Sequence, residues 1–155
     1  MSAVKPIPDG YHSVTPYLTF KSADAAIQFY KRAFGAKELS QLSTPECGIA
    51  HAEVQIGNSR LMMADEFPAF GNKSPETLGG SPVSMMFYVD DVDAAFSHAL
   101  KEGATERRPV ADQFYGDRTG TLVDPFGYQW SLGTHKEDVS EEEMQARMEK
   151  MYATQ

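Results

Sequence analysis

Residues 111–135 read ADQFYGDRTGTLVDPFGYQWSLGTH and hold the densest cluster of turn-forming residues in the chain. A strand expected over Gly120–Asp124 meets a second one over Gln129–Thr134 across the Pro125-Phe126-Gly127 turn, because Pro fixes one φ and Gly permits the opposite sign. The back half of this stretch repeats, in degenerate form, the segment from Val54 to Asp65. One supersecondary unit is therefore used twice.

The helical patterns upstream repeat in the same way. The segment DAAIQFYKRAFGA, beginning at Asp24, aligns with DAAFSHALKEGA, beginning at Asp93, if one residue of slippage is allowed. Ser22 and Asp91 are suited to cap the two helices, and a glycine after each apolar pattern favours a left-handed stop. Each half of the chain therefore contributes one helix with an apolar face.

Strands complete each half. Alternation of apolar and polar residues predicts them over Val14–Phe20, Lys37–Ser43, Ile49–Ile56, Leu61–Asp65, Val83–Val89 and Thr105–Ala111. Pro16 cannot donate to a ladder, so its strand lies at an edge or begins near Tyr17. Glu66 to Pro82 is rich in proline and glycine and indicates a long loop between the halves. Each half then reads β, α, β, β, β.

Composition limits the classes of partner. The chain has 155 residues and a formal net charge of −8, which argues against nucleic acid and against an anionic membrane surface. No apolar run approaches the roughly 20 residues of a membrane helix. A single cysteine, Cys47, excludes an internal disulfide and fits a reducing compartment. We expect a cytoplasmic protein and assign the Cys47 thiol to a loop or strand edge rather than to catalysis.

The last residues predict a short amphipathic helix. Ser140 and Glu143 form a capping box, and Met144, Met148, Met151 and Tyr152 repeat at helical spacing. This methionine-rich face needs a surface to pack against. We expect that surface to belong to the same domain, with a partner subunit as the alternative.

Several of these features together resemble the vicinal-oxygen-chelate superfamily, which includes glyoxalase I, bleomycin-resistance proteins and extradiol dioxygenases. The resemblance rests on Asp24-Ala25-Ala26, Asp93-Ala94-Ala95, Phe34-Gly35-Ala36, and Asp124-Pro125-Phe126-Gly127 followed by Trp130. More narrowly, PYL at 16–18, QFYGDR at 113–118 and THKED at 134–138 resemble the PhnB-like branch. The match covers about residues 11–138.

The resemblance implies an α+β fold of two tandem βαβββ modules whose curved sheets form an open barrel around a cavity, usually in a homodimer. It implies one domain over residues 1–138, made of module 1 (about 11–66) and module 2 (about 82–136), followed by the C-terminal helix at 139–155. Fold alone does not fix function.

The superfamily's metal enzymes hold a divalent ion with a histidine in the first strand of each module and a glutamate in a last strand. Carried over to this chain, those positions are Thr15, Ser84 and Ser131, and Met62 is the first module's equivalent of the last of them. None is a good ligand for a divalent cation. We therefore expect no metal and no other cofactor at the usual positions, which argues against glyoxalase I and dioxygenase chemistry.

A replacement site is conceivable on the strand that holds His51 and Glu53. The two residues are two positions apart and so face the same side. They suit a general base with its hydrogen-bonding partner, or two ligands of a displaced metal site completed by His135. The alternative is a polar strand face that touches solvent or another subunit.

The loop before the last hairpin offers an aromatic pair and an arginine. Arg118 could hold a substrate carboxylate or phosphonate while Tyr115 closes on it, since a planar guanidinium matches such oxyanions. Alternatively, Asp117 and Arg118 satisfy one another.

These strand phases predict a cavity lined by Thr15, Tyr17, Thr19, His51, Glu53, Met62, Ser84, Met86, Tyr88, Tyr115, Arg118, Gln129 and Ser131. Aromatic and thioether surface with a few polar anchors is typical of a small-molecule pocket. Three functions follow as hypotheses: a metal-independent protein that binds a small aromatic or cationic molecule, a lyase or isomerase that uses His51 or Glu53 or a displaced metal, and a structural homodimer with a vestigial pocket.

Overall fold

The computed structural model describes residues 3–46 and 48–154, so Cys47 and the role assigned to it lie outside the described residues. The chain divides into two compact units, Met1–Ser81 and Pro82–Gln155, which we call unit 1 and unit 2. None of the helices in the described part has the length and apolar content needed to cross a lipid bilayer.

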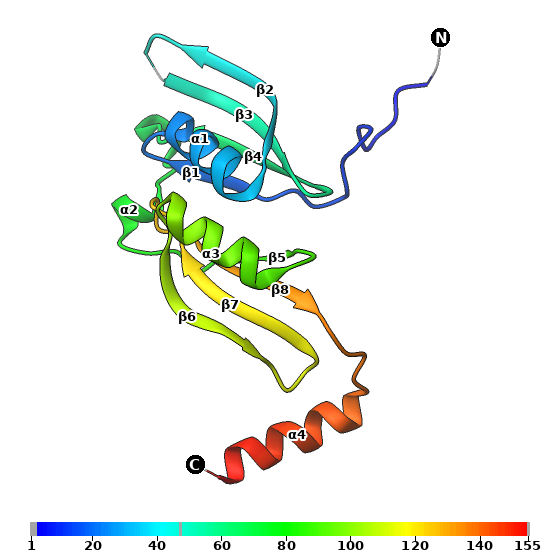
Figure 1. Ribbon diagram of the computed structural model, residues 1–155. Helices are drawn as coiled ribbons and strands as arrows, with labels where there is room; N and C mark the ends of the chain where they lie inside the picture. The colour runs from blue at the N-terminus through cyan, green and yellow to red at the C-terminus, as the bar shows by residue number, and fades with distance from the viewer. Residues whose placement is uncertain (1–2, 47, 155) are drawn as a thin grey trace. The chain divides into compact units, whose positions relative to one another are not determined.

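Unit 1 is a βαβββ module with two short helical turns after it (Figure 1). Its elements are β1 (Tyr17–Phe20), α1 (Ala23–Phe34), β2 (Lys37–Thr44), β3 (Gly48–Ile56), β4 (Ser59–Asp65), η1 (Pro68–Phe70) and α2 (Pro75–Leu78). The strand order is β1-β4-β3-β2. The β1 strand runs parallel to β4, and the other pairs are antiparallel.

Unit 2 repeats this arrangement and adds a terminal helix (Figure 1). Its elements are β5 (Ser84–Tyr88), α3 (Val92–Glu102), β6 (Thr105–Asp112), β7 (Asp117–Val123), β8 (Gln129–His135) and α4 (Glu141–Ala153). The strand order β5-β8-β7-β6 matches that of unit 1, with β5 parallel to β8. The predicted α+β fold of two βαβββ modules with curved four-stranded sheets is confirmed.

The duplication extends to the contact that joins each last strand to the start of its helix. The Ala23 backbone N–H at the start of α1 donates to Asp65 Oδ1 at 2.5 Å. The equivalent Val92 N–H at the start of α3 donates to Thr134 Oγ1 at 2.9 Å. One N–H that the helix itself cannot satisfy is thus paired in both units.

Each sheet has one face covered by the helix of its own unit and one that is not, which we call the open face. In unit 1 the helix covers the buried side chains of Leu18, Val54 and Met63. In unit 2 it covers those of Leu122 and Leu132, which are also fully buried. Because side chains alternate along a strand, the neighbours of these residues point to the open face.

The segment from Glu66 to Pro82 differs from the predicted loop because it contains η1 and α2. Ser74 caps α2, and Pro75 occupies its first turn, where a missing N–H has no cost. Hydrogen bonds from Thr77 and Ser74 lower the pKa of Glu66 to about 2. The prolines and glycines that indicated a loop here are start and stop signals of short helical turns.

The terminal helix forms where its capping box predicts it, with the Ser140 hydroxyl accepting from the Glu143 N–H. Its methionine face is covered only in part, since no residue of α4 is buried, Met144 and Met148 are half-buried, and Met151 is 41% exposed. Arg147 makes polar contacts, donating to Glu137 Oε1 at 2.9 Å and to the Phe114 carbonyl at 3.2 Å.

Candidate functional site

The open face of unit 1 brings together four residues that the sequence singled out. Tyr17 on β1 lies beside Met62 on β4, and Met62 lies beside Glu53 on β3. His51 precedes Glu53 by two residues and therefore shares its face. Tyr17 comes from a part of the sequence distant from His51 and Glu53, and the strand order places all three on one surface.

Their side chains form a continuous series of hydrogen bonds, which we call the Tyr17–His51–Glu53 chain. The Tyr17 hydroxyl and His51 Nδ1 are 2.8 Å apart, and His51 Nε2 and Glu53 Oε1 are 3.1 Å apart. A neutral imidazole satisfies both contacts when Nδ1 accepts from the phenol and Nε2 donates to the carboxylate. Burial raises the pKa of Tyr17, which favours the protonated phenol that this arrangement needs.

The Tyr17–His51–Glu53 chain can donate, accept or pass on a proton at a surface that a ligand can reach. Tyr17 is 49% exposed, and the side chains of His51 and Glu53 are partly exposed. A ligand on this face therefore meets an aromatic ring, the Met62 thioether and a carboxylate. This combination suits an aromatic or cationic group, and the imidazole between two partners suits proton transfer.

The open face of unit 2 carries a second hydrogen-bonded cluster, centred on Asp117. Asp117 is 5% exposed and accepts from the Tyr88 hydroxyl at 2.7 Å. Its other oxygen lies 2.6 Å from His135 Nδ1, and His135 Nε2 lies 2.8 Å from Asp138 Oδ1. The hydrogen bond to Asp117 raises the pKa of Tyr88. Sequence reasoning missed Asp117 as the centre because it placed that residue in a loop.

His135 gives unit 2 a predicted pH dependence. The hydrogen bonds to Asp138 and Asp117 raise the pKa of His135 above its ordinary value. Stability from these contacts is therefore fully present below about pH 6.5, the ordinary value for histidine, and is lost as pH rises through the raised pKa. We expect an NMR titration to place the His135 midpoint above 6.5 and to show a lower midpoint in Asp138→Asn. An unchanged midpoint in that variant would contradict this assignment.

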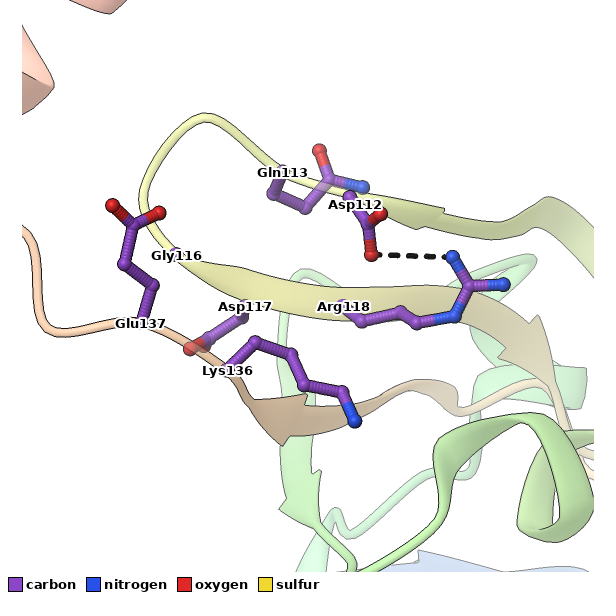
Figure 2. Close-up of a pocket in the computed structure, with 7 residues that line it drawn as sticks. All are labelled: Asp112, Gln113, Gly116, Asp117, Arg118, Lys136 and Glu137. Atoms are coloured by element: carbon purple, nitrogen blue, oxygen red, sulfur yellow. Dashed lines mark hydrogen bonds and ion pairs between the residues drawn. The ribbon is translucent and has the colours of Figure 1, made fainter.

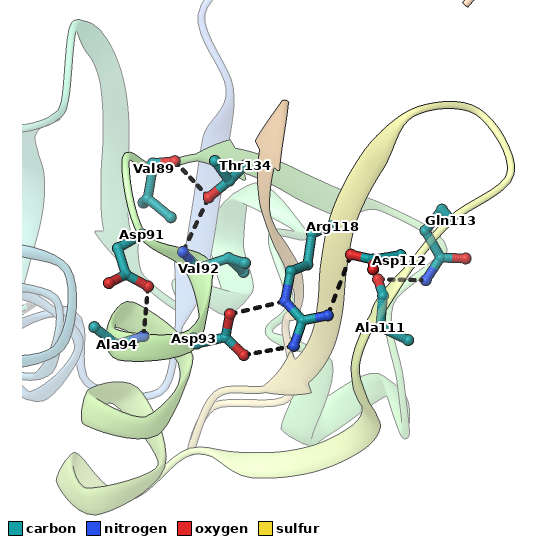
Figure 3. Close-up of polar contacts among 10 residues, drawn as sticks. All are labelled: Val89, Asp91, Val92, Asp93, Ala94, Ala111, Asp112, Gln113, Arg118 and Thr134. Carbon is teal, nitrogen blue, oxygen red and sulfur yellow. Dashed lines mark hydrogen bonds and ion pairs between the residues drawn. The ribbon is translucent and has the colours of Figure 1, made fainter. Parts of the chain in front are cut away.

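The Arg118 side chain points toward α3 and not into the cavity that the sequence predicted (Figure 3). Its Nε and Nη2 atoms donate to the two carboxylate oxygens of Asp93 on α3, each at 2.8 Å, and its Nη1 atom donates to Asp112 at 3.2 Å. This pairing lowers the pKa of Asp93 and raises that of Arg118. The guanidinium therefore ties β7 to the first turn of α3 on the covered face of the sheet.

Two expectations about Arg118 are corrected by this placement. Tyr115 lies on the open face, where its hydroxyl is 3.4 Å from Thr119 Oγ1, so it cannot close on a ligand held by Arg118. Asp117 also points to the open face, so it does not pair with Arg118. The physical reason is strand parity, because β7 begins at Asp117 and successive side chains point to opposite faces.

Two of the hollows formed by the described residues lie on unit 2. The larger, of about 560 Å³, is lined by Asp112, Gln113, Gly116, Asp117, Arg118, Lys136 and Glu137 (Figure 2). The smaller, of about 420 Å³, is lined by Tyr88, Val89, Asp90, Thr134 and His135. The larger one holds carboxylates beside a guanidinium that is already paired, so its charges are mostly committed to the fold.

The other predicted lining residues divide between the open faces of the two units, and the register of β5 with β8 brings four of them together in unit 2, where Ser84 lies beside Gln129 and Met86 lies beside Ser131. The Ser131 hydroxyl is 3.1 Å from that of Thr121, and Gln129 accepts from Arg107 at 2.6 Å. Met86 and Ser84 are exposed on β5. The remaining predicted residues, Thr15 and Thr19, are partly buried, the first just before β1 and the second within it.

The superfamily's usual metal positions do not fit an ion in this chain. Thr15, Ser84 and Ser131 offer only neutral hydroxyls, and the Ser131 hydroxyl already contacts another side chain. Within residues 3–46 and 48–154, no group of three or more His, Cys, Asp or Glu side chains could hold a metal ion.

Comparison with known proteins adds the family. A profile of the Glyoxalase/Bleomycin resistance protein/Dioxygenase superfamily matches residues 11–132. An uncharacterized protein of Mycobacterium bovis is 42% identical over 139 residues, which covers 88% of this chain and 91% of that protein. Protein PA1353 from Pseudomonas aeruginosa has a TM-score of 0.65 at 24% identity, with 82% of this chain and all of that one covered. A PhnB protein from Bacillus cereus has a TM-score of 0.61 at 21% identity, with 79% and 99% covered.

Proposed function

Because the chain belongs to the Glyoxalase/Bleomycin resistance protein/Dioxygenase superfamily, we propose that it binds a small molecule on the open face of unit 1, without the metal that the superfamily's enzymes use. The observation that carries this proposal is the Tyr17–His51–Glu53 chain. It presents an aromatic ring and a carboxylate at one surface, and both are partly accessible.

The charge of this face indicates the class of ligand. A carboxylate beside an aromatic ring attracts organic cations, through the charge of Glu53 and the electron-rich face of Tyr17. The net charge of −8 adds a long-range attraction for cations. We therefore propose a small aromatic or cationic compound as the ligand, which the protein would sequester as a resistance protein does.

Trimethylphenylammonium is a suitable probe because it combines an aromatic ring with a permanent cation. We expect Glu53→Gln to weaken its binding about twofold to fivefold, since an exposed charge contributes roughly 0.5–1 kcal/mol. Isothermal titration calorimetry measures the dissociation constant. Glu106→Gln, an exposed substitution in unit 2 with the same charge change, is the matched control and should bind as the wild type does. Equal affinity in wild type and Glu53→Gln would contradict the proposal.

The same hydrogen bonds favour a second candidate function, a lyase or isomerase acting on a small oxygenated substrate. His51 lies between a phenol and a carboxylate, so a proton taken from a substrate can be shared along the Tyr17–His51–Glu53 chain. An enzyme of this kind loses turnover in Glu53→Gln, whereas a binding protein loses only affinity for the cation. A structural dimer with a vestigial pocket is unaffected in both respects.

A further inference from the structure

Arg60 lies at one end of the same open face. It precedes Leu61, which is buried under α1, so its own side chain leaves the sheet on the opposite side. Arg60 lies beside Gln55 on β3 and precedes Met62, the neighbour of Tyr17, by two residues. Nothing in the sequence marks this arginine, because it stands just after the Gly57–Ser59 turn, where charged residues are common.

A strap formed by residues 8–11 covers the guanidinium of Arg60. The strap closes a turn in which the Tyr11 N–H donates to the Pro8 carbonyl at 3.1 Å, and the Tyr11 ring lies 4.5 Å from Arg60 Cζ. Gly10 has φ +83°, and a Cβ at this position would run into the Arg60 guanidinium. A glycine is therefore required for the strap to lie so close to the arginine.

Two buried hydrogen-bond donors on neighbouring side chains lack an acceptor within the described part of the chain. Within the described residues, the buried side-chain polar atoms that have no hydrogen-bond partner are Tyr11 Oη and Arg60 Nε, on two side chains in contact. Buried donors are normally paired, so two on adjacent residues indicate a place for an acceptor. A neutral carbonyl could serve one donor, but an oxyanion suits a guanidinium and a hydroxyl together.

Other arginines of the chain show what Arg60 lacks. Arg118 engages Asp93 and Asp112, and Arg147 engages Glu137 and Glu143. No carboxylate among the described residues forms an ion pair with Arg60, whose contact is with the Tyr11 ring. An arginine fixed by stacking and without an acidic partner is prepared for an anion from outside the chain.

We propose that Arg60 and Tyr11 bind an oxyanion, a carboxylate or phosphonate, on the ligand of the unit 1 face. This inference rests on the proposed function and sharpens it: the ligand carries an anionic group at the Arg60 end and an aromatic or cationic group at the Tyr17–His51–Glu53 chain.

Phenylphosphonate tests this site, because it carries the ring of trimethylphenylammonium with the opposite charge. We expect it to bind the wild type and to bind Arg60→Gln about tenfold more weakly, since hydrogen bonds to charged groups are the stronger ones. Tyr11→Phe removes only the hydroxyl and should weaken binding about threefold. Arg108→Gln, an exposed change of the same charge in unit 2, should leave affinity unchanged. The Arg60 Nε–H resonance should shift on titration.

The two probes separate failure of this inference from failure of the proposed function. If trimethylphenylammonium binds and depends on Glu53 while phenylphosphonate does not bind, or binds Arg60→Gln as it binds the wild type, the oxyanion site is overturned and the proposed function stands. If neither probe binds, both are overturned. Equal loss in Arg60→Gln and Arg108→Gln shows only a general response to charge and also overturns the site.

Discussion

Replacing Asp124 by alanine is expected to lower the free energy of unfolding of unit 2 by about 3–5 kcal/mol. Asp124 is 4% exposed, and its Oδ1 atom accepts from the backbone N–H groups of Phe126 at 2.9 Å and Tyr128 at 3.0 Å. Its Oδ2 atom accepts from the Trp130 indole at 3.0 Å. Alanine leaves all three donors without this acceptor in the hairpin that joins β7 to β8.

The single tryptophan of the chain belongs to this network, so urea denaturation followed by its fluorescence measures the loss directly. Asp124→Asn keeps one carbonyl oxygen and should cost less than alanine does. Asp90→Ala, an exposed substitution in the same unit, is the control and should change stability by less than about 0.5 kcal/mol. A loss below about 1 kcal/mol in Asp124→Ala would show that the turn does not depend on this carboxylate.

Local signals predicted the fold because they agreed with one another. Ser22 and Asp91 cap their helices as expected, each accepting from the N–H three residues later. Pro16 indicated that its strand lies at an edge or begins near Tyr17, and β1 does both. Where proline and glycine gave the only signal, as in the segment that contains α2, the sequence did not separate a loop from short helical turns.

The site was predictable only as far as strand parity could be trusted. His51 and Glu53 lie within a long alternating strand, so their common face followed from their spacing. Arg118 was misplaced because β7 was expected to begin at Gly120 rather than at Asp117. Counting back from the buried Leu122 in steps of two would have placed Arg118 on the covered face.

Arg60 could not have been found by pattern alone. The buried neighbour Leu61 shows that Arg60 points to the open face of the sheet. Nothing in the nearby sequence shows that Arg60 would lack an acidic partner. That property depends on the strap at residues 8–11, which reaches Arg60 from a distant part of the sequence. Partner choice among charged side chains is a tertiary property, and spacing along the chain does not determine it.

The two units fill the space between helix and sheet in opposite ways. At one helix position, unit 1 has Tyr30 and unit 2 has Ala99, both fully buried. At one position of the last strand of each unit, unit 1 has Leu61 on β4 and unit 2 has Trp130 on β8. Unit 1 therefore combines a large helix residue with a smaller strand residue, and unit 2 combines a small helix residue with a large strand residue. Close-packed cores tolerate such exchanges when total volume is kept.

Removing the large residue from unit 1 tests this reading. We expect Tyr30→Ala to cost about 3–5 kcal/mol, because a buried aromatic side chain is lost and a cavity remains. Its ring stacks on Phe34 at 5.7 Å between centroids and meets Phe20 edge-on at 6.1 Å. Hydrogen exchange of β3 amides measures the effect within unit 1, and β7 amides in unit 2 provide the internal reference.

Adding volume on the strand should then restore part of the loss. We expect Tyr30→Ala with Leu61→Phe to be more stable than Tyr30→Ala alone, because it reproduces the arrangement of unit 2. Phenylalanine is the better choice than tryptophan, since β3 and β4 are joined by a tight turn in which Ile56 pairs with Ser59 and no residue takes the place of Asp124 beside an indole N–H. If Leu61→Phe destabilises Tyr30→Ala further, the two positions do not share one packing space, and the units fill their cores independently.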